Sequence, residues 1–108
     1  AIHQMLDELV AGLRSILSAQ MVRIVLYGSV AGGTADVDSD IDVAGFVNNR
    51  LTSEQQDQLS YLVVDLNLKY DRVISVVDIE QQTYQMWKEV TPFYQNVDRE
   101  GIVLWKAA

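Results

Sequence analysis

Apolar residues near the start of the chain recur at steps of three and four positions, which is the spacing of one helix face. Over residues 2 to about 19 this face consists of Ile2, Leu6, Leu9, Leu13 and Ile16. A second stripe of this kind consists of Leu59, Leu62, Val63 and Leu66. Thr52 or Ser53 can cap the second helix, and Gln55 or Gln56 follows three positions later, as in a capping box. The pattern therefore predicts two long amphipathic helices.

Short runs rich in β-branched and aromatic residues lie between and after these stripes, as is typical of strands. The runs cover residues 22–27, 41–47, 72–77 and 102–105. We expect Asp78 to cap a short helix that runs through Trp87, and Thr91-Pro92 to open a further helical turn. Strands that alternate with helices predict an α/β (α+β) fold, with a small sheet of about four strands flanked by helices. The pattern alone does not give the direction of each strand.

Length and composition restrict the classes of protein. The 108 residues suit a single domain over residues 1–108. The absence of Cys excludes disulfides, thiolate zinc sites and a Cys nucleophile, and it is compatible with a reducing cytoplasm, where we expect the protein. No apolar run is long enough to span a membrane. No signal peptide is visible, although Ala1 in first position leaves a trimmed leader open.

The charge balance bears on the partners. With 15 acidic and 8 basic residues the formal net charge is −7, and the basic residues are dispersed. This argues against a surface for nucleic acid, which needs clustered Lys and Arg. A nucleotide stays compatible, because a metal ion can bridge carboxylates and phosphates. The aromatic residues gather late in the chain. We expect them to pack in the core, but a partner-docking patch and a homo-oligomer stay open.

The stretch from Gly28 to Asp42 carries the most chemical information. Gly28 permits a sharp turn and a close approach of the backbone to a ligand, and Ser29 adds a hydroxyl and an amide. Ten residues separate Ser29 from Asp40, and Asp42 lies two positions further, so both carboxylates face one side of a strand. Such a pair suits Mg²⁺, which takes waters and substrate phosphates as its other ligands. The arrangement predicts phosphoryl or nucleotidyl transfer.

Other phosphate and metal motifs fit poorly. The chain has neither the Gly-Lys-Ser/Thr of a P-loop nor a Gly-x-Gly-x-x-Gly fingerprint. Asp36, Asp38 and Asp40 imitate the first ligands of a calcium loop. However, Ile41 stands where that loop needs Gly, and Val47 where it needs Glu. We interpret Asp36 and Asp38 as part of a solvated turn.

Gly-Ser, ten residues and then Asp-x-Asp resembles the signature of the DNA polymerase β-type nucleotidyltransferase superfamily. The small size resembles its minimal nucleotidyltransferase (MNT) domains, which often pair with a HEPN-domain protein in toxin–antitoxin modules, and residues 92–105 resemble the end of such domains. The resemblance implies the polymerase β-type nucleotidyltransferase fold, whose small sheet is mixed. It also implies that Gly28 and Ser29 bind the phosphates of a nucleoside triphosphate. It implies that Asp40 and Asp42 are catalytic and bind Mg²⁺, with two ions expected. The implied reaction transfers AMP from ATP to a hydroxyl, such as a tyrosine of a partner HEPN toxin.

Two positions depart from the family pattern. Gly32 stands where an Arg is frequent, and Ser75 stands where a third carboxylate is expected. Asp78 is a candidate third metal ligand, but its strand parity faces away from that of Ser75, which favours a helix cap. These departures keep open a catalytically weak or inactive MNT domain that acts as an antitoxin by direct contact. Transfer to a small molecule, as in aminoglycoside-modifying relatives, ranks last.

Overall fold

The computed structural model describes residues 2–33 and 39–108. Asp36 and Asp38, which we interpreted as a turn, lie outside the described residues. The described elements, in chain order, are α1 (Ile2–Leu17), the 3₁₀ turn η1 (Ser18–Gln20), β1 (Met21–Tyr27), α2 (Gly28–Gly32), β2 (Ile41–Val47), α3 (Ser53–Tyr70), β3 (Ile74–Glu80), α4 (Gln81–Trp87), α5 (Pro92–Glu100) and β4 (Ile102–Lys106).

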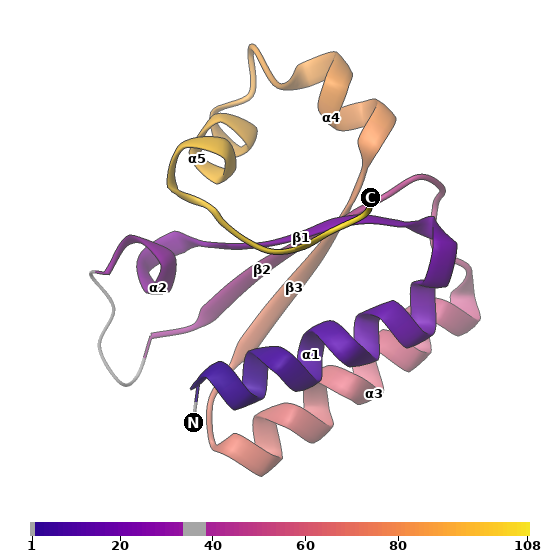
Figure 1. Ribbon diagram of the computed structural model, residues 1–108, viewed down its shortest axis with the longest axis vertical. Helices are drawn as coiled ribbons and strands as arrows, with labels where there is room; N and C mark the ends of the chain where they lie inside the picture. Colours follow the sequence, from indigo (N-terminus) through magenta and orange to yellow (C-terminus); the bar gives the residue numbers. More distant parts are fainter. Residues whose placement is uncertain (1, 34–38) are drawn as a thin grey trace.

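The four strands form one mixed sheet in the order β3-β2-β1-β4. β1 is antiparallel to both β2 and β4, whereas β2 and β3 are parallel. A parallel pair needs a long crossover, and α3 supplies it. Helices α1 and α3 cover one face of the sheet, and α4 and α5 lie on the other (Figure 1). The predicted α/β class and the small mixed sheet are confirmed.

The alternation of side chains along β2 divides the core in two. Ile41 and Val43 pack with α1 and α3, whereas Ala44 and Phe46 pack with residues of α4 and α5. Successive side chains of a strand point to opposite faces, so Asp42 belongs to the α4/α5 face. The sheet thereby separates a purely apolar core under α1 and α3 from the face that carries the candidate chemistry.

Both predicted helical stripes are confirmed. The middle members of the first stripe, Leu6, Leu9 and Leu13, are buried beneath α1. The cap of α3 is Thr52, whose Oγ1 accepts a hydrogen bond from the Gln55 amide at 3.1 Å. The Thr52 amide in turn donates to Gln55 Oε1 at 3.0 Å, which completes a capping box.

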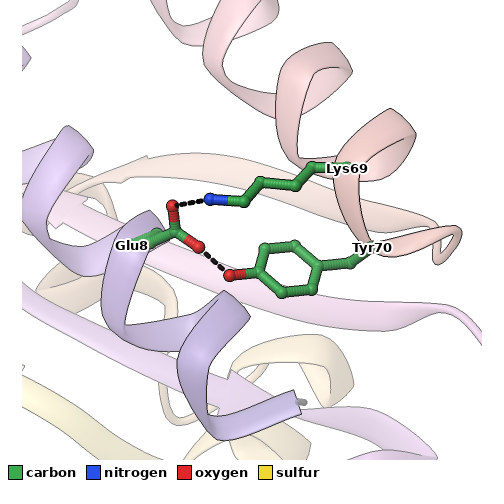
Figure 2. A network of polar contacts seen from close by, with 3 residues as sticks. All are labelled: Glu8, Lys69 and Tyr70. Atoms are coloured by element: carbon green, nitrogen blue, oxygen red, sulfur yellow. Dashed lines mark hydrogen bonds and ion pairs between the residues drawn. The ribbon is translucent and has the colours of Figure 1, made fainter.

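A polar network joins α1 to the end of α3 (Figure 2). Lys69 Nζ donates to Glu8 Oε1 at 2.7 Å, and the Tyr70 hydroxyl donates to Glu8 Oε2. The Lys69 side chain is 57% exposed, so its ion pair adds little free energy on its own. The network fixes how the two helices lie against each other at that end.

The predicted helix cap at Asp78 is wrong, because β3 continues through Glu80. Asp78 lies within the strand and pairs with Gly45, and Ile79 turns into the α4/α5 core. The pairing with the buried strand β2 continues to Glu80, which then precedes α4. The strand therefore runs past its predicted end at residue 77, because a buried partner strand and an inward-facing Ile79 stabilise the extended conformation.

No helix in the described part of the chain is long and apolar enough to cross a membrane.

Gly101 joins α5 to β4 where no side chain fits. A Cβ there would meet the Val97 carbonyl oxygen and would lie 2.5 Å from Val25 Cγ1 in the core. We predict that Gly101→Ala destabilises the fold by about 1–3 kcal/mol, the usual cost of overpacking. For a domain of this size each kcal/mol lowers Tm by about 4–8 °C. Thermal denaturation followed by circular dichroism measures the change.

Gly32→Ala is the matched control, because a Cβ at Gly32 would meet nothing within 4 Å. Its Tm should equal that of the wild type or exceed it slightly. Equal Tm values for the two variants would contradict the packing at Gly101.

Candidate active site

Three polar side chains lie in a row across the sheet on the α4/α5 face. Asp42 of β2 pairs directly with Tyr27 of β1 and with Ser75 of β3. Side chains of directly paired residues point to the same face, with Cβ atoms about 4.5–5.5 Å apart in an antiparallel pair. Asp42 is therefore flanked by a phenol on one side and a hydroxyl on the other.

The backbone turn after β1 lies close to the Asp42 carboxylate. Gly28 has a φ of +76°, and a Cβ at this position would lie 2.5 Å from Asp42 Oδ2. A side chain is thus excluded both by the backbone conformation and by the carboxylate. Ser29 follows in the first turn of α2 and is half-buried. The structure accordingly brings Gly28, Ser29 and Asp42 together, as the motif predicts.

Asp40 immediately precedes β2 and is exposed, and the residues on both sides of it are anchored. The Ile41 amide donates to the Val73 carbonyl at 2.8 Å. Arg72 Nη2 donates to the Ser39 carbonyl at 3.2 Å. The segment before β3 therefore holds the backbone around Asp40. Sequence analysis gave Arg72 no such role, because this contact joins residues 33 positions apart.

The electrostatics of the site follow from burial and from like charges. Burial raises the pKa of Asp42 above its ordinary value, and the negative charge of Asp40 raises it further. Burial also raises the pKa of the Tyr27 phenol, with a further contribution from Asp42. Asp40 and Asp42 are thus close enough to repel each other when both are ionised. A cation between them would relieve that repulsion.

The donor set fits a hard divalent cation that keeps other ligands. Asp40 and Asp42 offer carboxylate oxygens, and Mg²⁺ is usually bound by one or two carboxylates together with waters and phosphates. Within residues 2–33 and 39–108 no group of three or more His, Cys, Asp or Glu side chains could hold a metal ion. Among the described residues, the site thus offers two carboxylates and not a closed cage.

Asp78 is not brought to this pair. It lies three positions beyond Ser75 on β3, and its neighbours are residues of α3, including Leu59 and Val63, around a cavity on the opposite face. The residue of β3 that lies directly beside Asp42 is Ser75. In the described part of the site, the hydroxyl of Ser75 therefore stands beside Asp42 at the strand position where the family pattern has a carboxylate.

An aromatic pair lies at the β1 end of the row. The rings of Tyr27 and Phe93 are 5.5 Å apart between centroids, with their planes at 90°. Sequence analysis singled out neither residue for the site. The position of Tyr27 directly before Gly28 is a signal that could have indicated it. The position of Phe93 depends on how α5 packs and carries no local signal.

Comparison with known protein families shows which family this chain belongs to. Residues 13–107 match the family described as polymerase beta nucleotidyltransferase. The chain belongs to this nucleotidyltransferase family. The matched segment includes β1, the Gly28-Ser29 turn, Asp40, Asp42 and β4. The resemblance drawn from the spacing of Gly-Ser and Asp-x-Asp is confirmed.

Relatives of this nucleotidyltransferase extend the comparison. A Methanocaldococcus jannaschii protein, whose name provisionally assigns it as a protein adenylyltransferase, is 29% identical over 101 residues, which cover 94% of this chain and 96% of that protein. The crystal structure of spectinomycin adenyltransferase AAD(9) from Enterococcus faecialis, with ATP and spectinomycin, has a TM-score of 0.80 at 15% identity, covering 98% of this chain and 56% of that one.

A third relative comes from a toxin–antitoxin complex. The structure contains a tri-AMPylated Shewanella oneidensis HEPN toxin with its MNT antitoxin. Its similarity to this chain has a TM-score of 0.61 at 20% identity, over 97% of this chain and 72% of that one. At these identities the two solved structures establish a shared fold.

The raised pKa of Asp42 predicts that its ionised carboxylate lowers the stability of the folded protein. A carboxyl whose pKa is raised on folding disfavours the ionised form, so its contribution to stability worsens as pH rises above the ordinary value of 3.8. We predict that Asp42→Asn raises Tm at pH 7 by a few degrees and that the gain disappears in acid. Thermal denaturation at a series of pH values measures both effects.

Asp65→Asn is the control, because Asp65 is an exposed carboxylate of α3. Its Tm should stay close to that of the wild type at every pH. A fall in Tm for Asp42→Asn at pH 7 would show that the carboxylate stabilises the site.

Proposed function

We propose that this nucleotidyltransferase is Mg²⁺-dependent and transfers AMP from ATP to a protein hydroxyl, a tyrosine of a partner HEPN toxin. The observation that carries the proposal is the contact of the Gly28 turn with the Asp42 carboxylate, with Asp40 two residues before it. This arrangement places a backbone turn that carries no side chain beside a pair of carboxylates, which are hard metal ligands.

Each residue of the motif has a defined role in this reaction. Gly28 lets the backbone approach the triphosphate, and Ser29 donates to a phosphate oxygen from its amide or hydroxyl. Asp40 and Asp42 would hold the magnesium ions, two in the family pattern. When bound, these ions neutralise the phosphate charge and align the attacking and leaving oxygens. The acceptor oxygen, losing its proton, forms a bond to the α-phosphorus, while the bond to pyrophosphate breaks.

The relatives support a protein acceptor. The Methanocaldococcus jannaschii protein, provisionally named a protein adenylyltransferase, aligns over 96% of its length. The structure with the AMPylated HEPN toxin supports a HEPN partner and a nucleotide of the adenine class. The spectinomycin enzyme is similar over only 56% of its chain, which gives weaker support to a small-molecule acceptor.

Ser75 favours a second candidate function, a catalytically weak or inactive MNT domain that neutralises its partner by contact. Ser75 lies directly beside Asp42, where the family pattern has a carboxylate that helps to activate the acceptor. A neutral hydroxyl is a weaker metal ligand than a carboxylate. Gly32 also leaves α2 without the frequent Arg, so one cationic contact to phosphate is missing.

Label transfer distinguishes the two functions. ATP labelled on its α-phosphate is incubated with Mg²⁺ and lysate of the source cells, with either wild type or the Asp40→Ala/Asp42→Ala double variant. We predict that the wild type labels one protein band and the folded double variant labels none, because the metal ligands are gone. Equal labelling by the two proteins would refute the assignment of Asp40 and Asp42.

A substitution at Ser75 is predicted to increase the rate of transfer. Ser75→Asp puts a third carboxylate on the same face as Asp42, so we predict a several-fold higher initial rate of label transfer at limiting Mg²⁺. In the same experiment Asp78→Ser should transfer label at the wild-type rate, because Asp78 lies on the opposite face. Loss of transfer in Asp78→Ser would instead make Asp78 a ligand. A wild type without transfer that gains it through Ser75→Asp would identify the inactive binding module.

A further inference from the structure

Phe93 is a large apolar side chain exposed next to a polar site. It is the second residue of α5, and 39% of its surface is accessible. Its ring meets the Tyr27 ring edge to face, with centroids 5.5 Å apart. The pair leaves part of the Phe93 ring uncovered, so apolar surface remains that a ligand can bury.

The place of Phe93 relative to the site follows from the sheet register. Tyr27 is the direct cross-strand partner of Asp42 and faces the same side of the sheet. Gly28, the next residue, approaches the Asp42 carboxylate. Phe93 therefore lies beside Tyr27, at the β1 end of the row formed by Ser75, Asp42 and Tyr27, where α5 contacts α2 and β1.

Contacts within the α4/α5 layer hold Phe93 in place. The Tyr94 ring lies 5.7 Å from that of Phe93 and 5.6 Å from that of Tyr84. The Tyr84 hydroxyl donates to Asp98 Oδ2 at 2.6 Å, and Arg23 Nη2 lies 3.6 Å from Asp98 Oδ1. These contacts tie α5 to α4 and to β1. The partly exposed ring thus belongs to a fixed element, which reduces the conformational entropy that the protein loses when a ligand binds.

We propose that Phe93 is the platform on which the base of the nucleoside triphosphate stacks, with Tyr27 supporting it from behind. This inference rests on the proposed function and identifies a base-binding residue for it. With the phosphates at Gly28 and Ser29, the base would lie one ribose beyond the α-phosphate, and the partly exposed Phe93 ring lies at that end of the row. Stacking on an aromatic ring suits any base.

The contribution of the base to binding can be measured by comparing a nucleotide with a triphosphate that has no base. Isothermal titration calorimetry with Mg·ATP and with magnesium tripolyphosphate, which has no base, is performed on the wild type, Phe93→Leu and Phe93→Tyr. We expect Phe93→Leu to weaken Mg·ATP binding about 5- to 150-fold, which is the range of base–aromatic stacking, and to leave tripolyphosphate binding unchanged. Phe93→Tyr, which keeps the ring, should bind Mg·ATP with the wild-type Kd. Leu68→Ala, an exposed apolar control on α3, should do the same.

Each other outcome overturns a specific claim. Unchanged Mg·ATP binding by Phe93→Leu, with binding intact in the wild type, overturns the stacking role alone. An equal loss of ATP and tripolyphosphate would show that Phe93 acts through the phosphate site, and it overturns the stacking role as well. A wild type that binds neither probe refutes the proposed function, and the inference fails with it. Tm values of the variants confirm that each protein is folded in the titration.

Discussion

The contact between the Gly28 backbone and the Asp42 carboxylate constrains the rest of the site. It requires a positive φ and no side chain at position 28, and it requires β1 and β2 to pair so that Tyr27 opposes Asp42. A register shift of one residue would turn Asp42 into the apolar core under α1 and α3. The buried residues of β2, which alternate between two cores, therefore fix the position of the carboxylate as firmly as any polar contact does.

One face of the sheet carries the larger apolar core, and the other carries the ionisable residues of the candidate site. The α1/α3 face is closed by long amphipathic helices, a capping box and the Glu8 network, and it bears the larger apolar cluster. The α4/α5 face has a smaller cluster and accommodates the ionisable row. Burial and the charge of Asp40 both raise the pKa of Asp42, so this face is less stable than an apolar equivalent would be. Such a cost is typical of functional sites and is offset by the larger core.

Local patterns were sufficient for the long helices and for the motif, but long-range packing was not readable. Periodicity located α1 and α3, and the Thr52 and Gln55 pair located the cap, because each signal lies within a few residues. The end of β3 was not predicted, because it depends on pairing with the buried strand β2. Asp78, for example, pairs with Gly45, which lies 33 positions earlier in the chain. The place of Phe93 was missed for a similar reason, since it depends on the packing of α5.

Ser75 has a consequence for the order of binding in the proposed reaction. With a hydroxyl and not a third carboxylate beside Asp42, the site carries less negative charge, so its carboxylates repel one another less. The same change lowers the attraction for a free divalent cation, since fewer anionic ligands face it. In the proposed reaction the triphosphate would supply the missing negative charge. Magnesium and nucleotide would then bind such a site together, because each would provide part of the charge that holds the other.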